Sequence, residues 1–143
     1  MKDNDESLID TNILVYAYDI SQGEKYRKAR ELIEKIWKEG GGVITIQNMA
    51  EFVLVVTRKV QNPIPISEAK RIVEGIRSSA KWRVLDRNIE TFLKGIELYE
   101  NLQIPFRDAQ IASVLLDNGV GKIVTEDKDF EKVRGIKVIN PFN

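Results

Sequence analysis

The 143-residue chain contains neither cysteine nor histidine. Without cysteine it has no disulfide framework, no thiolate nucleophile and no zinc–thiolate site, which is consistent with a reducing compartment. Without histidine it lacks the most common general base and the most common transition-metal ligand. Any catalysis must therefore rely on carboxylates, lysine, hydroxyl groups or a hard metal ion held by oxygen atoms.

An excess of charge of one sign is also absent. The 22 lysine and arginine residues balance 22 aspartate and glutamate residues, so no global positive field attracts nucleic acid. A nucleic-acid partner would need a local basic patch or a bound cation. Apolar runs such as 52–56 are far too short to span a membrane, and the opening residues MKDNDES lack the apolar segment of a secretory signal. We expect a cytoplasmic protein with no membrane partner.

Short apolar strands alternate with helical patterns along the chain. Strands are expected at 8–10, 43–46, 82–85, 123–124 and 136–139, and helices at 13–18, 22–39, 47–59, from Ser67, from Asn88 to Leu102, and at 107–117. Strands separated by helices indicate a parallel sheet with helices on both faces. The predicted fold is α/β, with about five strands in a single domain over residues 1–143.

Two local interpretations concern how helices begin, and a third concerns burial. Ser21 and Glu24 have the spacing of a capping box, and Ser67 can cap the helix that follows a loop with two prolines. The segment 47–59 is apolar on nearly every side, which predicts a deeply buried helix.

Four carboxylates stand where their neighbours are apolar. Asp10 and Asp127 come from the ends of two predicted strands, and in open α/β sheets ligands bind at the edge where parallel strands end. Glu51 is the one charge within QNMAEFVLVV, and Asp108 shares the inner side of its helix with Ile111. Like charges about 4 Å apart repel by roughly 4 kcal/mol per pair at an effective dielectric near 20, so a convergent cluster needs a cation. Mg²⁺ or Mn²⁺ suits oxygen ligands of this kind.

Each of these acids also has an ordinary structural explanation. Asp10 can cap the helix that follows it, and Glu51 can pair with Arg58 or another base. The helix dipole favours Asp108 in a first turn. Asp127 can be a turn residue, and Asp129 can cap a local turn.

The motifs together resemble the PIN-domain nucleases, and most closely the toxin ribonucleases of prokaryotic VapBC toxin–antitoxin pairs. The resemblance follows the family's order and covers essentially the whole chain. It is carried by IDTNIL at 9–14, Thr45-Ile46-Gln47 with Glu51-Phe52, Arg107-Asp108-Ala109 with Ile111-Ala112, VTEDKDF at 124–130 and the closing Asn140-Pro141.

The resemblance implies a role for each matching position. Asp10, Glu51, Asp108 and Asp127 fall on the family's acidic metal-binding and catalytic positions. Asn12 and Thr125 fall on polar positions that support the site by hydrogen bonding. Asp129 matches a further acid, which we expect to lie around the metal ligands rather than to be one of them. No acidic position is missing, so we expect an active enzyme.

The implied activity is Mg²⁺- or Mn²⁺-dependent hydrolysis of RNA, leaving a 5′-phosphate and a 3′-hydroxyl. The implied partners are RNA, a second copy of the chain in a homodimer, and an inhibitory antitoxin. Candidate phosphate contacts lie near the acidic motifs, although solvated charge or an ion pair with the site is the better explanation for any one of them. They are Arg58, Lys59, Arg107 and Lys128.

Three other classes of function compete with a nuclease. The chain could be a binding module for RNA or protein in which the acids form an ion-pair network. A phosphoacceptor receiver domain needs an acidic pair after the first strand, and Asp10-Thr11-Asn12 supplies one acid only. A dinucleotide-binding domain is disfavoured because no Gly-x-Gly-x-x-Gly follows the first strand.

Overall fold

The structure is a computed structural model that describes residues 5–143, in which strands and helices alternate as predicted. In chain order the elements are β1 (Ser7–Ile9), α1 (Thr11–Tyr16), the 3₁₀ helix η2 (Ile20–Gln22), α2 (Glu24–Glu39), β2 (Gly42–Thr45), α3 (Ile46–Arg58), α4 (Ile66–Ser78), β3 (Trp82–Leu85), α5 (Ile89–Leu102), α6 (Phe106–Asp117), β4 (Lys122–Val124), the 3₁₀ helix η3 (Lys128–Lys132) and β5 (Lys137–Ile139).

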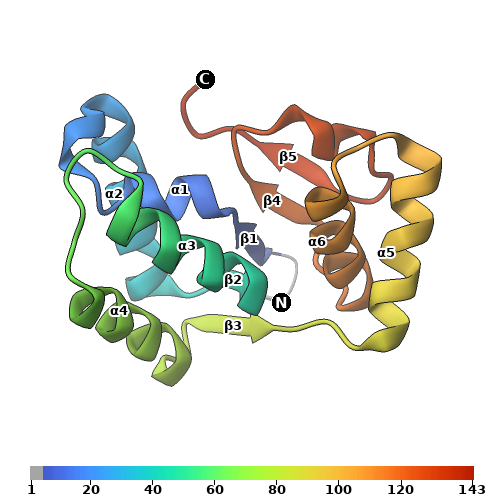
Figure 1. Ribbon diagram of the computed structural model, residues 1–143, viewed down its shortest axis with the longest axis horizontal. Helices are drawn as coiled ribbons and strands as arrows, with labels where there is room; N and C mark the ends of the chain where they lie inside the picture. Colours follow the sequence, from blue (N-terminus) through green and yellow to red (C-terminus); the bar gives the residue numbers. More distant parts are fainter. Residues whose placement is uncertain (1–4) are drawn as a thin grey trace.

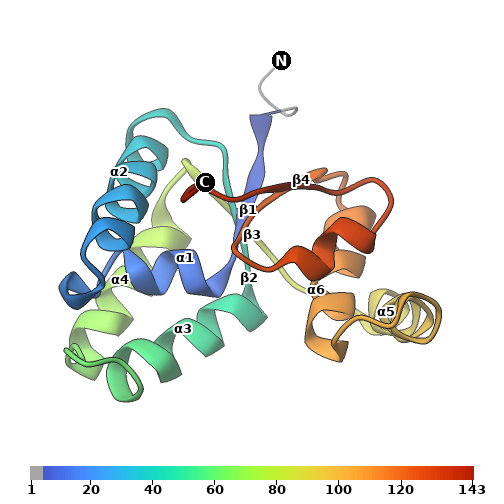
Figure 2. The same cartoon turned by 90° about the horizontal axis from the view of Figure 1, so that it is seen from above.

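Within residues 5–143, five strands form one parallel sheet in the order β3-β2-β1-β4-β5. Strand β1 is central, and Leu8 is paired with Val43 on one side and Ile123 on the other. Figures 1 and 2 show α1 to α4 on one face of this sheet and α5 and α6 on the other. The predicted α/β fold with helices on both faces is confirmed.

The strands supply two cores because successive side chains point to opposite faces. On the α1–α4 side, Ile9 and Ile44 pack in a cluster that includes Phe52. On the α5–α6 side, Leu8 and Val43 pack in a second cluster with α6. Every residue of β2 is buried, which explains why that strand is continuously apolar apart from its last residue.

The two expected helix caps are wrong. Ser21 lies in η2, where the buried Asp19 accepts hydrogen bonds from its backbone and hydroxyl, and α2 begins after Gly23 without a side-chain cap. Helix α4 begins at Ile66 with Pro65 in the cap position, so Ser67 lies inside the first turn. In both cases a nearby residue with a fixed or unusual φ sets the helix start.

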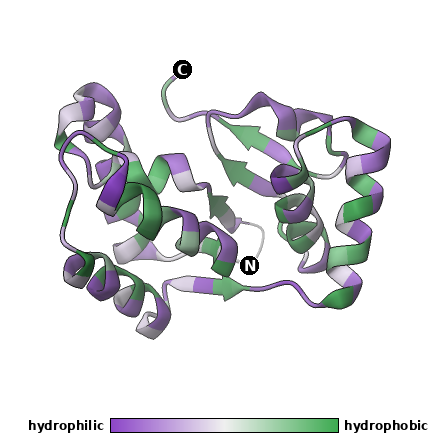
Figure 3. Ribbon diagram, in the orientation of Figure 1, coloured by the Kyte–Doolittle hydropathy of each residue, from purple (hydrophilic) through white to green (hydrophobic). Residues whose placement is uncertain are grey.

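Helix α3 is buried on one face only, so the prediction that it is deeply buried is wrong. Phe52 and Val56 are buried, but the side of the helix away from the sheet leaves Leu54 50% exposed. Figure 3 shows hydrophobic and hydrophilic segments mixed along the helices, as expected for elements with one solvent face.

Helix α5 also carries apolar side chains on its outer face. Ile89, Leu93 and Ile96 recur at helical spacing and are exposed, and Tyr99 continues the same stripe. No helix within the described part of the chain is both long enough and apolar enough to cross a membrane.

Gln103 ends α5 in the left-handed conformation, with φ 54° and ψ 47°. Among residues 5–143 it is the one non-glycine residue with a positive φ. This conformation costs a residue with a Cβ roughly 1–2 kcal/mol, and glycine adopts it freely.

We expect Gln103→Gly to raise the free energy of unfolding by about 0.5–1 kcal/mol, because the relieved strain exceeds the entropy that glycine adds to the unfolded chain. Urea unfolding followed by circular dichroism measures the change. Gln61→Gly, at an exposed loop residue without a positive φ, is the control and should give no gain. An equal response in both variants would contradict the strain at Gln103.

Candidate metal centre

The site lies where β1 and β4 end. Asp10 follows β1, caps α1 by accepting from the backbone N–H of Thr11 at 2.8 Å, and is 1% exposed. Thr125 follows β4, and its hydroxyl donates to Asp10 Oδ2 at 2.7 Å. The same hydroxyl oxygen accepts from the backbone N–H of Asp127 at 3.0 Å. Thr125 therefore joins the two strand ends and fixes one carboxylate against the next.

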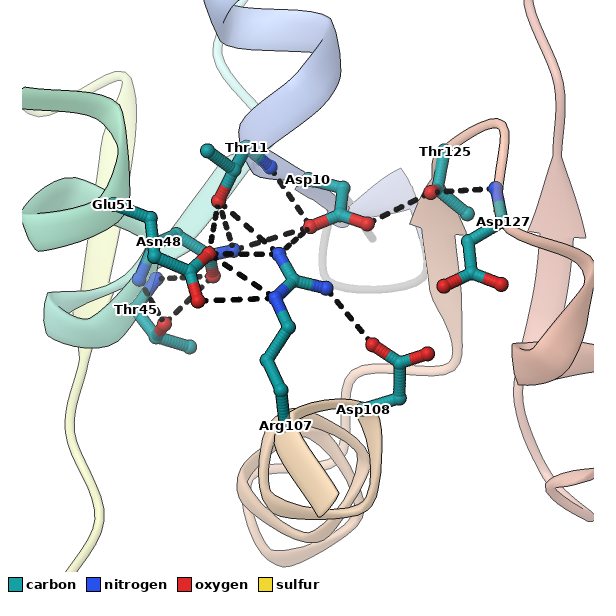
Figure 4. A network of polar contacts seen from close by, with 9 residues as sticks. All are labelled: Asp10, Thr11, Thr45, Asn48, Glu51, Arg107, Asp108, Thr125 and Asp127. Atoms are coloured by element: carbon teal, nitrogen blue, oxygen red, sulfur yellow. Dashed lines mark hydrogen bonds and ion pairs between the residues drawn. The ribbon is translucent and has the colours of Figure 1, made fainter. Parts of the chain in front are cut away.

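Two helices bring further acids to this edge. Glu51 reaches in from α3 and is partly exposed, and Asp108 reaches in from the first turn of α6 and is 1% exposed. Figure 4 shows the side chains of Asp10, Glu51, Asp108 and Asp127 around one space. The structure thus brings together the four acids that the sequence singled out.

Arg107 lies at the centre of these acids. Its Nη2 donates to Asp10 Oδ1 at 2.6 Å and to Glu51 Oε1 at 2.8 Å, its Nη1 donates to Asp108 Oδ1 at 2.9 Å, and its Nε donates to Glu51 Oε2 at 3.0 Å (Figure 4). The partner of Glu51 is therefore Arg107 rather than Arg58. Arg107 was a candidate phosphate contact, and in this conformation it makes the alternative contact, an ion pair with the site.

The other candidate phosphate contacts do not pair with the carboxylates among the described residues. Arg58, Lys59 and Lys128 are exposed, and within residues 5–143 none of the three forms an ion pair.

A second layer of hydrogen bonds holds Asp10 and Glu51 in place. The amide of Asn48 donates to Asp10 Oδ1 at 3.2 Å and to Thr11 Oγ1 at 3.0 Å, and the Thr11 hydroxyl donates to Glu51 Oε1 at 2.7 Å. Asn48 is itself fixed by Thr45, because the two residues form a capping box at the start of α3.

Sequence reasoning missed Asn48 and Thr11. The Thr45-x-x-Asn48 spacing before an apolar helix is a capping signal that could have pointed to Asn48. Asn12, which was expected to support the site, lies on α1, and its buried Oδ1 has no hydrogen-bond partner within the described residues.

Arg107 contacts only one of the two carboxylate oxygens of Asp108. Asp108 Oδ2 is buried and has no hydrogen-bond partner among residues 5–143. Asp108, Asp127 and Asp129 each offer one carboxylate oxygen, and the three atoms lie within 4.8 Å of one another. The turn here is capped by Asp127, which accepts from the backbone N–H of Asp129 at 2.9 Å, so Asp129 does not have the capping role considered for it. Converging oxygens from three carboxylates, and a buried unpaired oxygen on one of these residues, fit a hard divalent ion.

Burial and charge shift the pKa values of these acids in opposite directions. Burial and the neighbouring Asp127 raise the pKa of Asp108 to about 7, although Arg107 opposes the shift. Burial would also raise the pKa of Glu51, but hydrogen bonds from Arg107 and Thr11 lower it below its ordinary value. In the metal-free site, Asp108 therefore ionises less readily than an ordinary aspartate, and Glu51 ionises more readily than an ordinary glutamate.

A polar contact on the far side of Asp127 ties its turn to α1 and α2. The hydroxyl of Tyr16 donates to Glu126 Oε1 at 2.6 Å, and the ammonium of Lys25 pairs with the same carboxylate. Phe142 packs edge-on against Tyr16, so the end of the chain covers this contact. The arrangement restrains Glu126, the residue immediately before Asp127.

A pocket of about 460 Å³ opens beside the acids. Its lining includes Asp10, Glu51, Arg107 and Asp127 together with valines of α1, α3 and the following loop. Its volume falls within the range of about 300–1,000 Å³ that is common for ligand pockets.

Parallel strands that end in carboxylates, with two helices supplying more, define an α/β protein with an acidic site at a sheet edge. Residues 7–136 match the family profile of the PIN domain. The chain therefore belongs to the PIN-domain family. Comparison with curated proteins finds no match.

Several solved structures share this fold at low sequence identity. One is a toxin–antitoxin complex from Klebsiella pneumoniae (18% identity, TM-score 0.67, 95% of this chain and 98% of that chain covered). Another is VapC20 of Mycobacterium tuberculosis, a toxin that cleaves the sarcin–ricin loop (16%, 0.69, 88% and 93%). A third is VapBC2 of Rickettsia felis bound to a DNA fragment from its promoter (19%, 0.65, 94% and 97%).

The raised pKa of Asp108 gives a testable pH dependence. Because the folded state holds this proton more tightly than the unfolded chain, the contribution of Asp108 to stability is greatest below about pH 4 and is lost as pH rises toward 7. In EDTA we expect Asp108→Asn to be more stable than the parent by roughly 1–3 kcal/mol at pH 8, with the difference shrinking toward pH 4.

Chemical denaturation between pH 4 and 8 measures this difference. Asp117→Asn, at the other end of α6, is the control, because Lys94 and Thr91 lower the pKa of Asp117 and its loss should reduce stability at pH 8. A parent protein as stable as Asp108→Asn at pH 8 would contradict the shift.

Proposed function

We propose that this protein is a metal-dependent endoribonuclease and the toxin of a type II toxin–antitoxin pair. The observation that carries the proposal is the convergence of Asp10, Glu51, Asp108 and Asp127 at the carboxyl ends of β1 and β4, together with the unpaired buried oxygen of Asp108. Carboxylates that lie close together repel one another, so their convergence indicates a site that binds a divalent cation. Membership of the PIN-domain family supports the same activity.

In this proposal the four acids would hold Mg²⁺ or Mn²⁺. When bound, a divalent ion of this kind activates water, orients the phosphate and stabilises the leaving oxygen. Thr125 fixes Asp10 through the 2.7 Å hydrogen bond, and Asn48 and Thr11 fix Asp10 and Glu51. These contacts keep the carboxylates in place, so they do not have to reorganise during the reaction.

The residues around the acids would support the metal and bind the RNA. Asp129 would support the ion alongside Asp127, and Asn12 lines the same pocket as the acids. Arg107 lies in that pocket, and we assign Arg58, Lys59 and Lys128 to contacts with more distant phosphates. A neutral chain with few such contacts predicts RNA binding with a shallow dependence on salt.

The direct test is cleavage of structured RNA by the purified protein with Mg²⁺, with Mn²⁺ and with EDTA. We expect metal-dependent cleavage that leaves 5′-phosphates, and a loss of about 100-fold or more in Asp10→Asn and Asp108→Asn, because each removes a ligand charge. Asp117→Asn makes the same chemical change at the opposite end of α6 and should retain full activity.

Two results would contradict the nuclease. Cleavage that survives EDTA or both substitutions would come from another site or another protein. RNA binding without cleavage in either metal would favour the alternative, a non-catalytic module. The ion pairs of Arg107 with Asp10, Glu51 and Asp108 give that alternative its structural support.

The proposed partners are an antitoxin and a second copy of the chain. Toxin–antitoxin complexes among the structural neighbours support the antitoxin. The exposed stripe of Ile89, Leu93, Ile96 and Tyr99 on α5 supports self-association, because a contiguous apolar surface of this kind commonly marks an interface.

We expect Leu93→Lys with Ile96→Lys to shift the parent dimer to monomer, since two charges would be buried in the interface. Analytical ultracentrifugation over a range of concentrations measures the shift. Leu54→Lys, at an exposed position on α3, is the matched control and should leave the dimer intact. A dimer that survives the α5 substitutions would place the interface elsewhere.

A further inference from the structure

Each of the three nitrogen atoms of the Arg107 guanidinium donates to a carboxylate, and Nη2 also donates to Thr11 Oγ1 at 3.2 Å. Nη2 is shared between Asp10 and Glu51, Nη1 contacts Asp108, and Nε contacts Glu51, at distances between 2.6 and 3.1 Å. Arginine keeps its charge throughout the accessible pH range, so it acts here as a fixed monovalent cation. It lies where a metal ion would be expected to neutralise the charges of these carboxylates.

Arg107 and a divalent ion compete for the same oxygen atoms. Asp10 Oδ1 and Asp108 Oδ1 each accept a hydrogen bond from the guanidinium, and Asp10 Oδ2 is already taken by Thr125. Mg²⁺ binds carboxylate oxygens at about 2.0–2.1 Å, which is closer than the guanidinium nitrogens now lie. An ion that takes Asp10 Oδ1 or Asp108 Oδ1 as a ligand would therefore have to displace the guanidinium from that oxygen.

The geometry also provides a direction of approach and a place for Arg107 to go. Asp108 Oδ2 has no hydrogen-bond partner among residues 5–143, and Asp108, Asp127 and Asp129 each offer one carboxylate oxygen to a common group. Arg107 itself is 32% exposed and lines the open pocket. It is the second residue of α6, so its side chain can turn into the pocket without moving the helix.

We propose that Arg107 is an exchangeable counter-cation: it holds the acids together in the metal-free protein, leaves them when the divalent ion binds, and then contacts an RNA phosphate from the pocket. The inference rests on the proposed function, because it takes the acids to be the metal site. It assigns one residue two successive partners. It also explains how a buried acidic cluster is stable before a metal arrives.

The first test uses the unmodified protein and Mg²⁺ alone. In a ¹H–¹⁵N spectrum of the arginine side chains, the Nε–H of Arg107 in EDTA should be slowly exchanging and shifted by its bonds to Glu51. On titration with Mg²⁺ this signal should move or broaden in step with the backbone amides of Asp108 and Asp127. Amides that report binding while the Arg107 signal stays unchanged would overturn the inference.

The second test measures Mn²⁺ binding without RNA, by calorimetry. Arg107→Gln should bind Mn²⁺ about tenfold more tightly than the parent, because no ion pair has to be broken, and Arg107→Lys should fall between the two. In EDTA the melting temperature of Arg107→Gln should drop, and saturating Mn²⁺ should restore it. Arg71→Gln makes the same change of charge on the exposed face of α4, and both its affinity and its melting temperature should match the parent.

The outcomes separate this inference from the proposed function. Suppose that the parent binds Mn²⁺ and that Arg107→Gln and Arg107→Lys bind it equally well or more weakly. This result overturns the exchange of Arg107 for the ion, but it does not contradict the metal-dependent nuclease. Mn²⁺ binding in none of the proteins overturns the nuclease and with it the exchange. If Arg107→Gln does not fold in EDTA, the variant is mixed with Mn²⁺. Recovery of its fold supports the exchange. Failure to recover, together with Mn²⁺ binding by Arg107→Lys that equals the parent's, counts against the exchange.

Discussion

The repulsion among carboxylates at the end of the sheet is the constraint on which the site depends. Two of these acids, Asp10 and Asp108, are almost fully buried, where an unpaired charge is costly. Arg107 offsets that cost with direct contacts to three carboxylates. The hydrogen bonds from Thr125, Asn48 and Thr11 then fix the oxygen atoms around it. Without a cation at this position the acids could not converge.

The fold makes this convergence possible through its parallel sheet. Parallel strands end at one edge, and the crossover helices of such a sheet begin at the same edge. Asp10 and Thr125 are 115 residues apart in sequence, yet adjacent strands bring them within hydrogen-bonding distance. Glu51 belongs to α3 on one face of the sheet and Asp108 to α6 on the other, so each face supplies one acid (Figure 2). The site therefore lies between the two cores and depends on both.

Much of the architecture could be predicted because its signals are local. Period-two burial in strands and period-3.6 patterns in helices depend on near neighbours, and the strand–helix order followed from them. The wrong predictions have a different cause. Ser21 has the right spacing for a cap, but the buried Asp19 binds it instead, and Leu54 is as apolar as its neighbours but points to solvent. Which face of an apolar helix is covered depends on elements distant in sequence.

The sequence by itself determined which acids were out of place, because a carboxylate with apolar neighbours in the sequence is unusual in any fold. It also determined the fold class and the order of the motifs. Only the tertiary structure decided what compensates those acids. Arg107 is adjacent to Asp108 in the chain, but its other partners, Glu51 and Asp10, are 56 and 97 residues away. Coulombic contacts depend on distance in space, and no sequence pattern distinguishes an arginine that pairs with a site from one that faces water.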